Sequence, residues 1–63
     1  MRNRIGELAR GKGVKFNYLA EKCKVSNQTF SRWVKNETQP DLFQAAIIAG
    51  ELRVSIEDLI ESK

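Results

Sequence analysis

The chain has 63 residues, of which 41% are hydrophobic and 30% are charged. This length supports one domain, residues 1–63, around one small core, and the content of Leu, Ile, Val and Phe predicts a folded chain. It contains one cysteine, Cys23, and no histidine, which excludes an internal disulfide, a Cys/His zinc site and histidine-based acid–base catalysis.

The net charge of +3 is unevenly distributed. Residues 1–35 contain nine basic and two acidic residues, whereas residues 36–63 contain two basic and six acidic residues. Such polarity orients a protein in a phosphate field over about 8 Å, although charges that segregate on a solvated surface are an equally open explanation. No membrane span or signal-peptide pattern is present, so we expect a cytoplasmic protein with no membrane partner.

The first two predicted helices follow from apolar residues at helical spacing. The first covers about residues 2–10 and is ended by Gly11 and Gly13. A stripe at i, i+3, i+4 and i+7 predicts a second helix that stops near Cys23 or Lys24. The first helix presents Ile5, Leu8 and Ala9, and the second presents Phe16, Leu19, Ala20 and Cys23.

A third helix is predicted to begin almost at once. Ser26 can cap it with its hydroxyl, and Phe30, Trp33 and Val34 supply its apolar face. Trp33 could instead stack on a base, but its spacing from Phe30 favours packing in the core. Only about two residues separate the second and third helices, and so short a turn makes them cross steeply, as in a helix-turn-helix unit.

Two more helices are predicted after the polar loop 35–40. Asp41 can cap a fourth helix from Leu42 to about Leu52, and Ser55 with Asp58 resembles a capping box that opens a fifth. The predicted inner face of the fourth helix comprises Leu42, Ala45, Ala46, Ala49 and Leu52. The fifth presents Ile56, Leu59 and Ile60.

The expected fold is therefore all-α, with five short helices around one core. The predicted core comprises Ile5, Leu8, Leu19, Ala20, Val25, Phe30, Trp33, Ala49, Leu52, Val54, Ile56 and Leu59.

Residues 16–33 resemble the helix-turn-helix of the lambda-repressor-like, Cro/XRE-type DNA-binding proteins. The resemblance continues through residues 39–42 and 52–60, and thus covers nearly the whole chain. It implies a compact five-helix domain that inserts residues 26–33 into the major groove. The matching residues are Leu19 and Ala20 in the first helix of the motif, Val25 and Ser26 at the start of the second, Phe30 and Trp33 at its buried positions, and Asn36 in the loop beyond.

The outward face of the third helix carries the candidate base-reading residues. Amides there can pair with adenine N6/N7 and a guanidinium with guanine O6/N7. A merely solvated face is the alternative, but such a face would be expected to carry Glu/Lys pairs at i, i+4. The base-reading candidates are Asn27, Gln28, Ser31 and Arg32.

Phosphate contacts are expected from the ends of the second and third helices and the loop that follows. Solubility alone could explain Arg10 and Lys12, and a frayed terminus explains Arg2 and Arg4 better than a DNA-binding arm does. The predicted phosphate contacts are Lys15, Asn17, Ser26, Thr29, Lys35 and Asn36.

The chain departs from the family pattern at two positions. Most relatives have a phosphate-binding glutamine at the start of the second helix, where this chain has Phe16. Either Lys15 or Asn17 substitutes for it, or Phe16 extends the core. Many relatives have glycine at the position of Lys24, because that residue is left-handed, so we expect strain of about 1 kcal/mol there.

Phe43 and Ile47 form an apolar ridge on the outer face of the predicted fourth helix. Together with Ile60 they form a candidate dimer patch, and packing beneath the loop or against the fifth helix is the alternative. The related proteins bind two-fold symmetric operators, so the resemblance implies a homodimer on double-stranded DNA.

The sequence thus predicts a sequence-specific DNA-binding transcriptional regulator, in the role of a repressor, with no cofactor and no metal. A helix-turn-helix module that binds a protein, as in an antitoxin, is the alternative, which Phe16 favours and the basic half opposes. An enzyme is the weakest reading, because the one candidate nucleophile, Cys23, has the spacing of a buried small hydrophobe.

Overall fold

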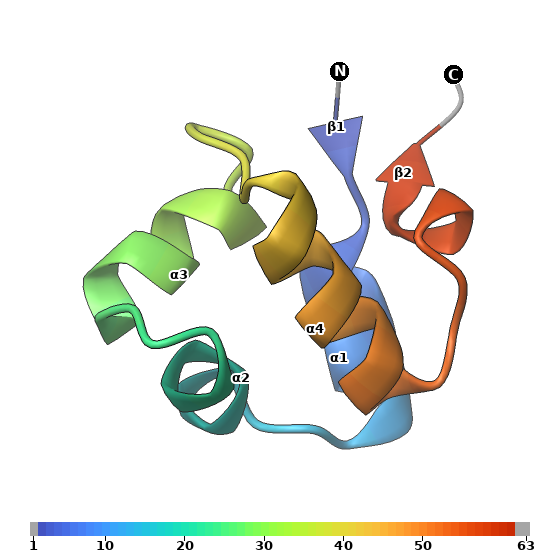
Figure 1. The fold of residues 1–63 in the computed structure, drawn as a ribbon, viewed down its shortest axis with the longest axis horizontal. Coiled ribbons are helices and arrows are strands. Elements are labelled where there is room, and N and C mark those ends of the chain that lie inside the picture. Colours follow the sequence, from blue (N-terminus) through green and yellow to red (C-terminus); the bar gives the residue numbers. More distant parts are fainter. Residues whose placement is uncertain (1, 62–63) are drawn as a thin grey trace.

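Four α-helices and a short two-stranded sheet make up the computed structural model, which describes residues 2–61 (Figure 1). The all-α fold is confirmed, but the fifth helix is reduced to a single 3-10 turn. The elements are β1 (Arg2–Asn3), α1 (Ile5–Lys12), α2 (Phe16–Lys22), α3 (Asn27–Val34), α4 (Leu42–Leu52), the 3-10 helix Glu57–Leu59 and β2 (Ile60–Glu61).

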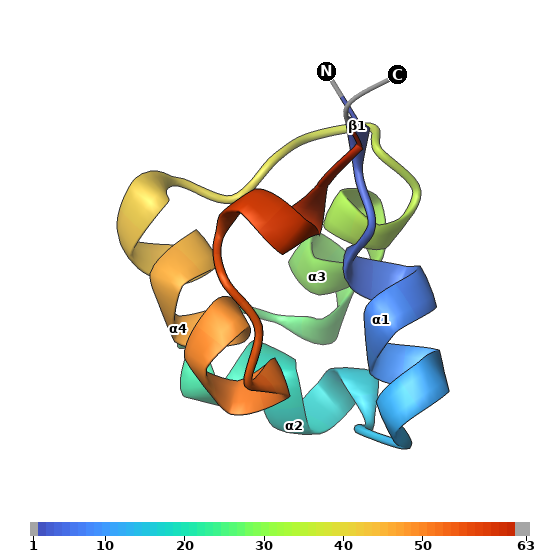
Figure 2. The ribbon, with the colours of Figure 1, turned by 90° about the vertical axis from the view of Figure 1, so that its right-hand side faces the viewer.

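The first helix was predicted to begin at residue 2, and this is wrong. Arg2 and Asn3 form β1, which pairs antiparallel with β2 at the other end of the chain. The Asn3 side-chain oxygen accepts the Ile5 N–H at 3.0 Å, so α1 starts only after it. Figures 1 and 2 show β1 and β2 side by side at the edge of the helical body.

The other end of α1 lies later than predicted. Gly11 stays inside the helix, and Gly13 ends it in the left-handed conformation, at φ 72°, with its N–H bonded to the last carbonyls. Only a residue without a Cβ adopts this conformation at little cost, which is why the helix stops there.

The turn between α2 and α3 has the predicted form. Lys24 is left-handed at φ 60°, and the Val25 N–H returns to the Ala20 carbonyl at 3.0 Å. The Ser26 hydroxyl then accepts the Thr29 N–H at 3.1 Å and caps α3. Figure 1 shows α2 end-on while α3 lies across the view, so the two helices cross steeply.

The predicted start of α4 is confirmed, but its inner face is partly wrong. Asp41 and Gln44 form a reciprocal capping box. Leu42 is 73% exposed and Ala46 is also exposed, whereas Ile48, which was not predicted, is fully buried. The inward-facing stripe differs from the predicted one because α4 carries apolar residues on more than one face. It comprises Ala45, Ile48, Ala49 and Leu52.

The predicted fifth helix is wrong beyond its first turn. The capping box itself forms, because the Ser55 N–H donates to the Asp58 carboxylate at 3.1 Å and the Asp58 N–H to the Ser55 hydroxyl at 3.2 Å. Ile60 then becomes extended, at φ −102° and ψ 129°, and joins β1. Pairing between the two ends of the chain therefore ends this helix.

One apolar core joins the four helices and the 3-10 turn. Most of the predicted core is confirmed, while Leu8, Val25, Val54 and Ile56 are half-buried against it rather than inside it. Cys23 is buried as expected, and desolvation raises the pKa of its thiol, with a smaller contribution from Asp41. The buried residues are Ile5, Ala9, Leu19, Ala20, Cys23, Phe30, Trp33, Ile48, Ala49, Leu52 and Leu59.

Gly6 fixes how closely α1 approaches α3. A Cβ at this position would lie 2.7 Å from Cγ1 of Val34, whereas a Cβ at Gly11 in the same helix would meet nothing within 4 Å. We expect Gly6→Ala to lower the free energy of unfolding by about 1 kcal/mol, because overpacking outweighs the gain in helix propensity. Gly11→Ala should raise it by about 0.5–1 kcal/mol. Urea denaturation that shifts both variants in the same direction would contradict the close approach.

Candidate nucleic-acid interface

The exposed face of α3 presents an uninterrupted polar surface. The side chains of Asn27, Gln28 and Arg32 are exposed and Ser31 is half-buried. At 100° per residue these four positions span an arc of about 140°. Among residues 2–61, none of their side chains has a hydrogen-bond or ion-pair partner. Their amide, hydroxyl and guanidinium groups are therefore available to an external ligand.

The opposite face of α3 holds the helix rigidly against the core. Phe30 and Trp33 are almost fully buried, as predicted, with ring centroids 5.6 Å apart. Phe16, the first residue of α2, packs on Phe30 with their ring centroids 5.6 Å apart, and so extends the core. This buried side fixes the direction in which the exposed side points.

The two hydroxyl candidates at the start of α3 are partly used within the helix. Ser26 Oγ accepts the Thr29 N–H and lies 3.1 Å from the Thr29 hydroxyl. Ser26 remains exposed and Thr29 is half-buried. Their first role is to cap α3: the Ser26 hydroxyl donates to Thr29 Oγ1, which leaves the Thr29 hydroxyl proton for a phosphate.

Three other phosphate candidates lie on exposed helix ends next to α3. Lys15 precedes the first turn of α2 and makes no side-chain capping bond, and Asn17 is exposed within that turn. Lys35 is exposed where α3 ends. Lys15 and Asn17 thus come from a helix that packs directly on α3, and Lys35 follows α3.

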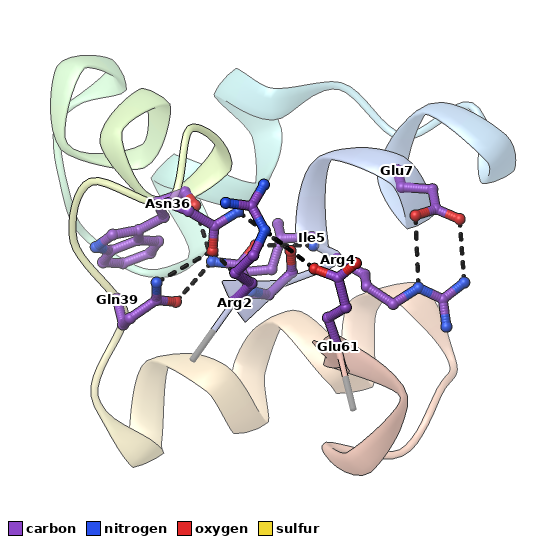
Figure 3. Close-up of polar contacts among 9 residues, drawn as sticks. Arg2, Arg4, Ile5, Glu7, Asn36, Gln39 and Glu61 are labelled. Atoms are coloured by element: carbon purple, nitrogen blue, oxygen red, sulfur yellow. Dashed lines mark hydrogen bonds and ion pairs between the residues drawn. The ribbon is translucent and has the colours of Figure 1, made fainter. Parts of the chain in front are cut away.

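Asn36 lies in a hydrogen-bond network that the sequence did not reveal. It is left-handed at φ 63°, and its side-chain oxygen accepts the Asn3 N–H at 2.7 Å and the Gln39 amide at 3.1 Å (Figure 3). The Asn3 amide in turn donates to the Trp33 carbonyl at 2.8 Å and to Gln39 at 2.7 Å. Asn36 thus ties β1 to the end of α3, and its side-chain amide is already occupied within the protein.

The sequence contains only part of the signal for this network. An asparagine after a helix is a known left-handed terminator, which identifies Asn36 as a stop. Nothing in the sequence indicates that Asn3, 33 positions away, is its partner.

Arg2 and Arg4 do not form the frayed terminus expected from the sequence. Arg2 bonds Glu61 across the small sheet at 3.0 Å, and Arg4 bonds Glu7 at 3.1 Å (Figure 3). The pKa of Arg4 is raised, first by its hydrogen bond to Glu7 and then by the charge of that carboxylate. Both pairs are exposed, so each adds little to stability.

The candidate dimer patch lies on α4 and β2. Phe43 is 82% exposed, so the alternative that it packs inside the domain is wrong, whereas Ile47 and Ile60 are each 39% exposed. Beside them is an apolar hollow of about 230 Å³, lined in part by Leu42, Ile56 and Ile60. The patch runs along the outer face of α4 toward β2.

A family model described as helix-turn-helix matches residues 12–59. The chain belongs to the helix-turn-helix family. It is a lambda-repressor-like domain in which α2 and α3 form the motif, as the resemblance implied.

Two solved structures resemble this helix-turn-helix domain. A Bacteroides fragilis protein, described as a candidate DNA-binding protein, is 35% identical with a TM-score of 0.89, over 95% of this chain and 97% of that one. A transcriptional regulator from Listeria innocua is 21% identical with a TM-score of 0.75, and the whole chain spans 65% of it, so it supports the fold alone. A comparison with curated protein sequences finds no match.

Two further properties concern the described part of the helix-turn-helix domain. Among residues 2–61, no helix has the length and apolar composition needed to cross a membrane. The same residues contain no group of three or more His, Cys, Asp or Glu side chains placed to hold a metal ion.

Proposed function

We propose that this domain binds specific sequences of double-stranded DNA and regulates transcription, with α3 in the major groove. The observation that carries the proposal is the division of α3 into a buried edge, Phe30 and Trp33, and an outward edge whose amide, hydroxyl and guanidinium groups have no partner among residues 2–61. The match to the helix-turn-helix family and the likeness to a candidate DNA-binding protein support it.

The proposed reading residues are Asn27, Gln28, Ser31 and Arg32. Asn27 and Gln28 stand in the first turn of α3, the part of a recognition helix that reaches deepest into the groove. Their amides suit adenine, and the Arg32 guanidinium suits guanine. Each bidentate pair contributes about 1–3 kcal/mol of discrimination against a wrong base.

Phosphate contacts are proposed on both flanks of α3. Lys15 and Asn17 come from the start of α2, Ser26 and Thr29 from the cap of α3, and Lys35 and Asn36 from its end. Asn36 can offer little to a phosphate, since its side-chain amide already bonds Asn3 and Gln39. Basic residues dominate the half of the chain that contains α2 and α3, so the attraction to phosphate is long-range as well as local.

Repression is the regulatory role that we propose. Tight occupation of a site excludes other proteins from it sterically, and this output requires no catalytic group or cofactor in the domain. A two-fold symmetric operator would place two copies of α3 in successive major grooves, about 10 bp apart.

A second copy of this chain is the proposed occupant of the patch formed by Phe43, Ile47 and Ile60. A ridge and a neighbouring apolar hollow on one surface allow a self-complementary contact, in which the Phe43 ring of each copy enters the hollow of the other. The patch belongs to α4 and β2, and no residue of these elements is among the proposed DNA contacts, so DNA binding and pairing are compatible.

We expect Phe43→Ser to shift the domain toward monomer in sedimentation equilibrium without changing its stability, because the side chain is exposed. Tyr18→Ser, which removes an exposed aromatic from α2, is the matched control and should leave the association unchanged. A wild-type domain that is monomeric at every concentration, both free and on DNA, would exclude the dimer.

Fluorescence titration of labelled duplexes at several salt concentrations tests the DNA-binding proposal. The logarithm of the binding constant should fall linearly with the logarithm of salt, with a slope of about −0.9 for each phosphate neutralised. The protein-binding alternative predicts no measurable affinity for any duplex, together with a protein recovered by the immobilised domain. That pair of results would replace the proposal.

A further inference from the structure

A polar hollow of about 320 Å³ lies beside the contact between α1 and the C-terminal end of α3. Four basic side chains line it, from β1, the residue before α1, α1 itself and the residue after α3, against two acidic ones. The basic residues are Arg2, Arg4, Arg10 and Lys35, and the acidic residues are Glu7 and Glu61. The charge of this lining favours an anion.

Internal ion pairs account for only part of this charge. Glu61 neutralises Arg2 at 3.0 Å, and Glu7 neutralises Arg4 at 3.1 Å. Within residues 2–61, no ion pair involves Arg10 or Lys35. The hollow therefore retains two positive charges without an internal counterion, and both come from residues that border α3.

Arg10 is held in place although it has no ion pair. Its guanidinium carbon lies 5.4 Å from the centroid of the Phe16 ring. One terminal guanidinium nitrogen lies 3.6 Å from the point that a Cβ on Gly6 would occupy. Cγ1 of Val34 in α3 lies 2.7 Å from the same point. The side chain thus reaches from α1 toward both helices of the motif.

The contact with Phe16 leaves the Arg10 N–H groups without a hydrogen-bond partner among residues 2–61. A guanidinium on an aromatic ring uses its flat face, while its N–H groups point outward in the plane. Phe16 is itself fixed by its contact with Phe30 in the core. Arg10 is therefore restrained beside Phe16, with N–H groups that can donate to an oxyanion such as a phosphate.

We propose that Arg10 is a ligand of the DNA phosphate backbone, positioned by Phe16 and assisted by Lys35. The inference rests on the proposed DNA binding and adds α1 to the interface. Val34 lies one residue before Lys35 and three after Ser31, so Arg10 lies along the edge of the exposed face of α3 where a backbone strand beside the groove would run.

The test compares salt-dependent affinities of the wild type with Arg10→Gln, Arg10→Lys and Phe16→Leu on one duplex. Arg10→Gln should weaken binding about tenfold and reduce the magnitude of the salt slope by about 0.9, equally on all sequences. Arg10→Lys should keep the slope but lose part of the affinity, because an ammonium cannot form the planar fork. Phe16→Leu should weaken binding with the charge still present, since the ring no longer orients it.

Arg53→Gln, which removes the same charge from the end of α4, is the control and should change neither affinity nor slope. A wild type that fails to bind any duplex would overturn the proposed function itself. A wild type that binds while Arg10→Gln matches it in affinity and slope would overturn only the role of Arg10. Circular dichroism of each variant separates loss of binding from loss of fold, and Arg10→Gln alone decides the outcome if Phe16→Leu unfolds.

Discussion

Asn36→Ala is expected to lower the free energy of unfolding by about 2–4 kcal/mol, which is most of the stability that a core of this size supplies. The variant leaves the half-buried Asn3 N–H without its acceptor at 2.7 Å and removes the bonds to Gln39 and to the Asn3 carbonyl. It also places a Cβ without a side-chain amide at φ 63°, which costs about 1 kcal/mol. Urea denaturation measures the change directly.

Two variants at the same position separate these causes. Asn36→Gly removes the amide but relieves the left-handed backbone, so it should cost about 1 kcal/mol less than Asn36→Ala. Asn36→Asp keeps an acceptor for the Asn3 N–H and should be milder than either substitution. If all three variants unfold at the wild-type urea concentration, the network does not stabilise the fold.

Gln28→Ala is expected to reduce the ratio of specific to non-specific DNA affinity by roughly 5- to 150-fold, the value of one bidentate base contact. Gln28 is exposed and bonds nothing within the described chain, so its removal should leave stability unchanged. Lys35→Ala is the matched contrast. It should weaken operator and random DNA alike and reduce the magnitude of the salt slope by about 0.9.

Competition titrations with operator and random duplexes measure the ratio of specific to non-specific affinity for each variant. The two variants must differ in kind, since one removes discrimination and the other removes uniform attraction. Equal losses on both duplexes for Gln28→Ala would show that this side chain does not read bases.

The helix-turn-helix itself could be predicted from the sequence. Its signals are local: a serine that caps α3, a stripe from Phe16 to Cys23, and a turn too short for any arrangement but a steep crossing. Even the left-handed Lys24 followed from the family pattern and is observed. Such features depend on neighbours within a few residues.

The pairing of the chain ends could not be predicted. β1 and β2 are two residues each, too short to show an alternating pattern, and they are 57 positions apart in the register Asn3 to Ile60. The same pairing explains both boundary errors, because it removes Arg2 and Asn3 from α1 and Ile60 from the expected fifth helix.

The error in α4 has a different origin. This helix is apolar on most of its faces, so periodicity alone cannot select the inner one. Leu42 was placed inward and is exposed, whereas Ile48 was passed over and is fully buried. Packing against α1 and α2, which no local pattern encodes, decides between them.

Selection of bound sequences from a pool of random duplexes tests the central claim, that α3 reads DNA sequence. We predict that the wild-type domain enriches one motif, arranged as two inverted half-sites whose centres lie about 10 bp apart. A recovered pool that matches the input in base composition and shows no motif at any salt concentration would contradict it.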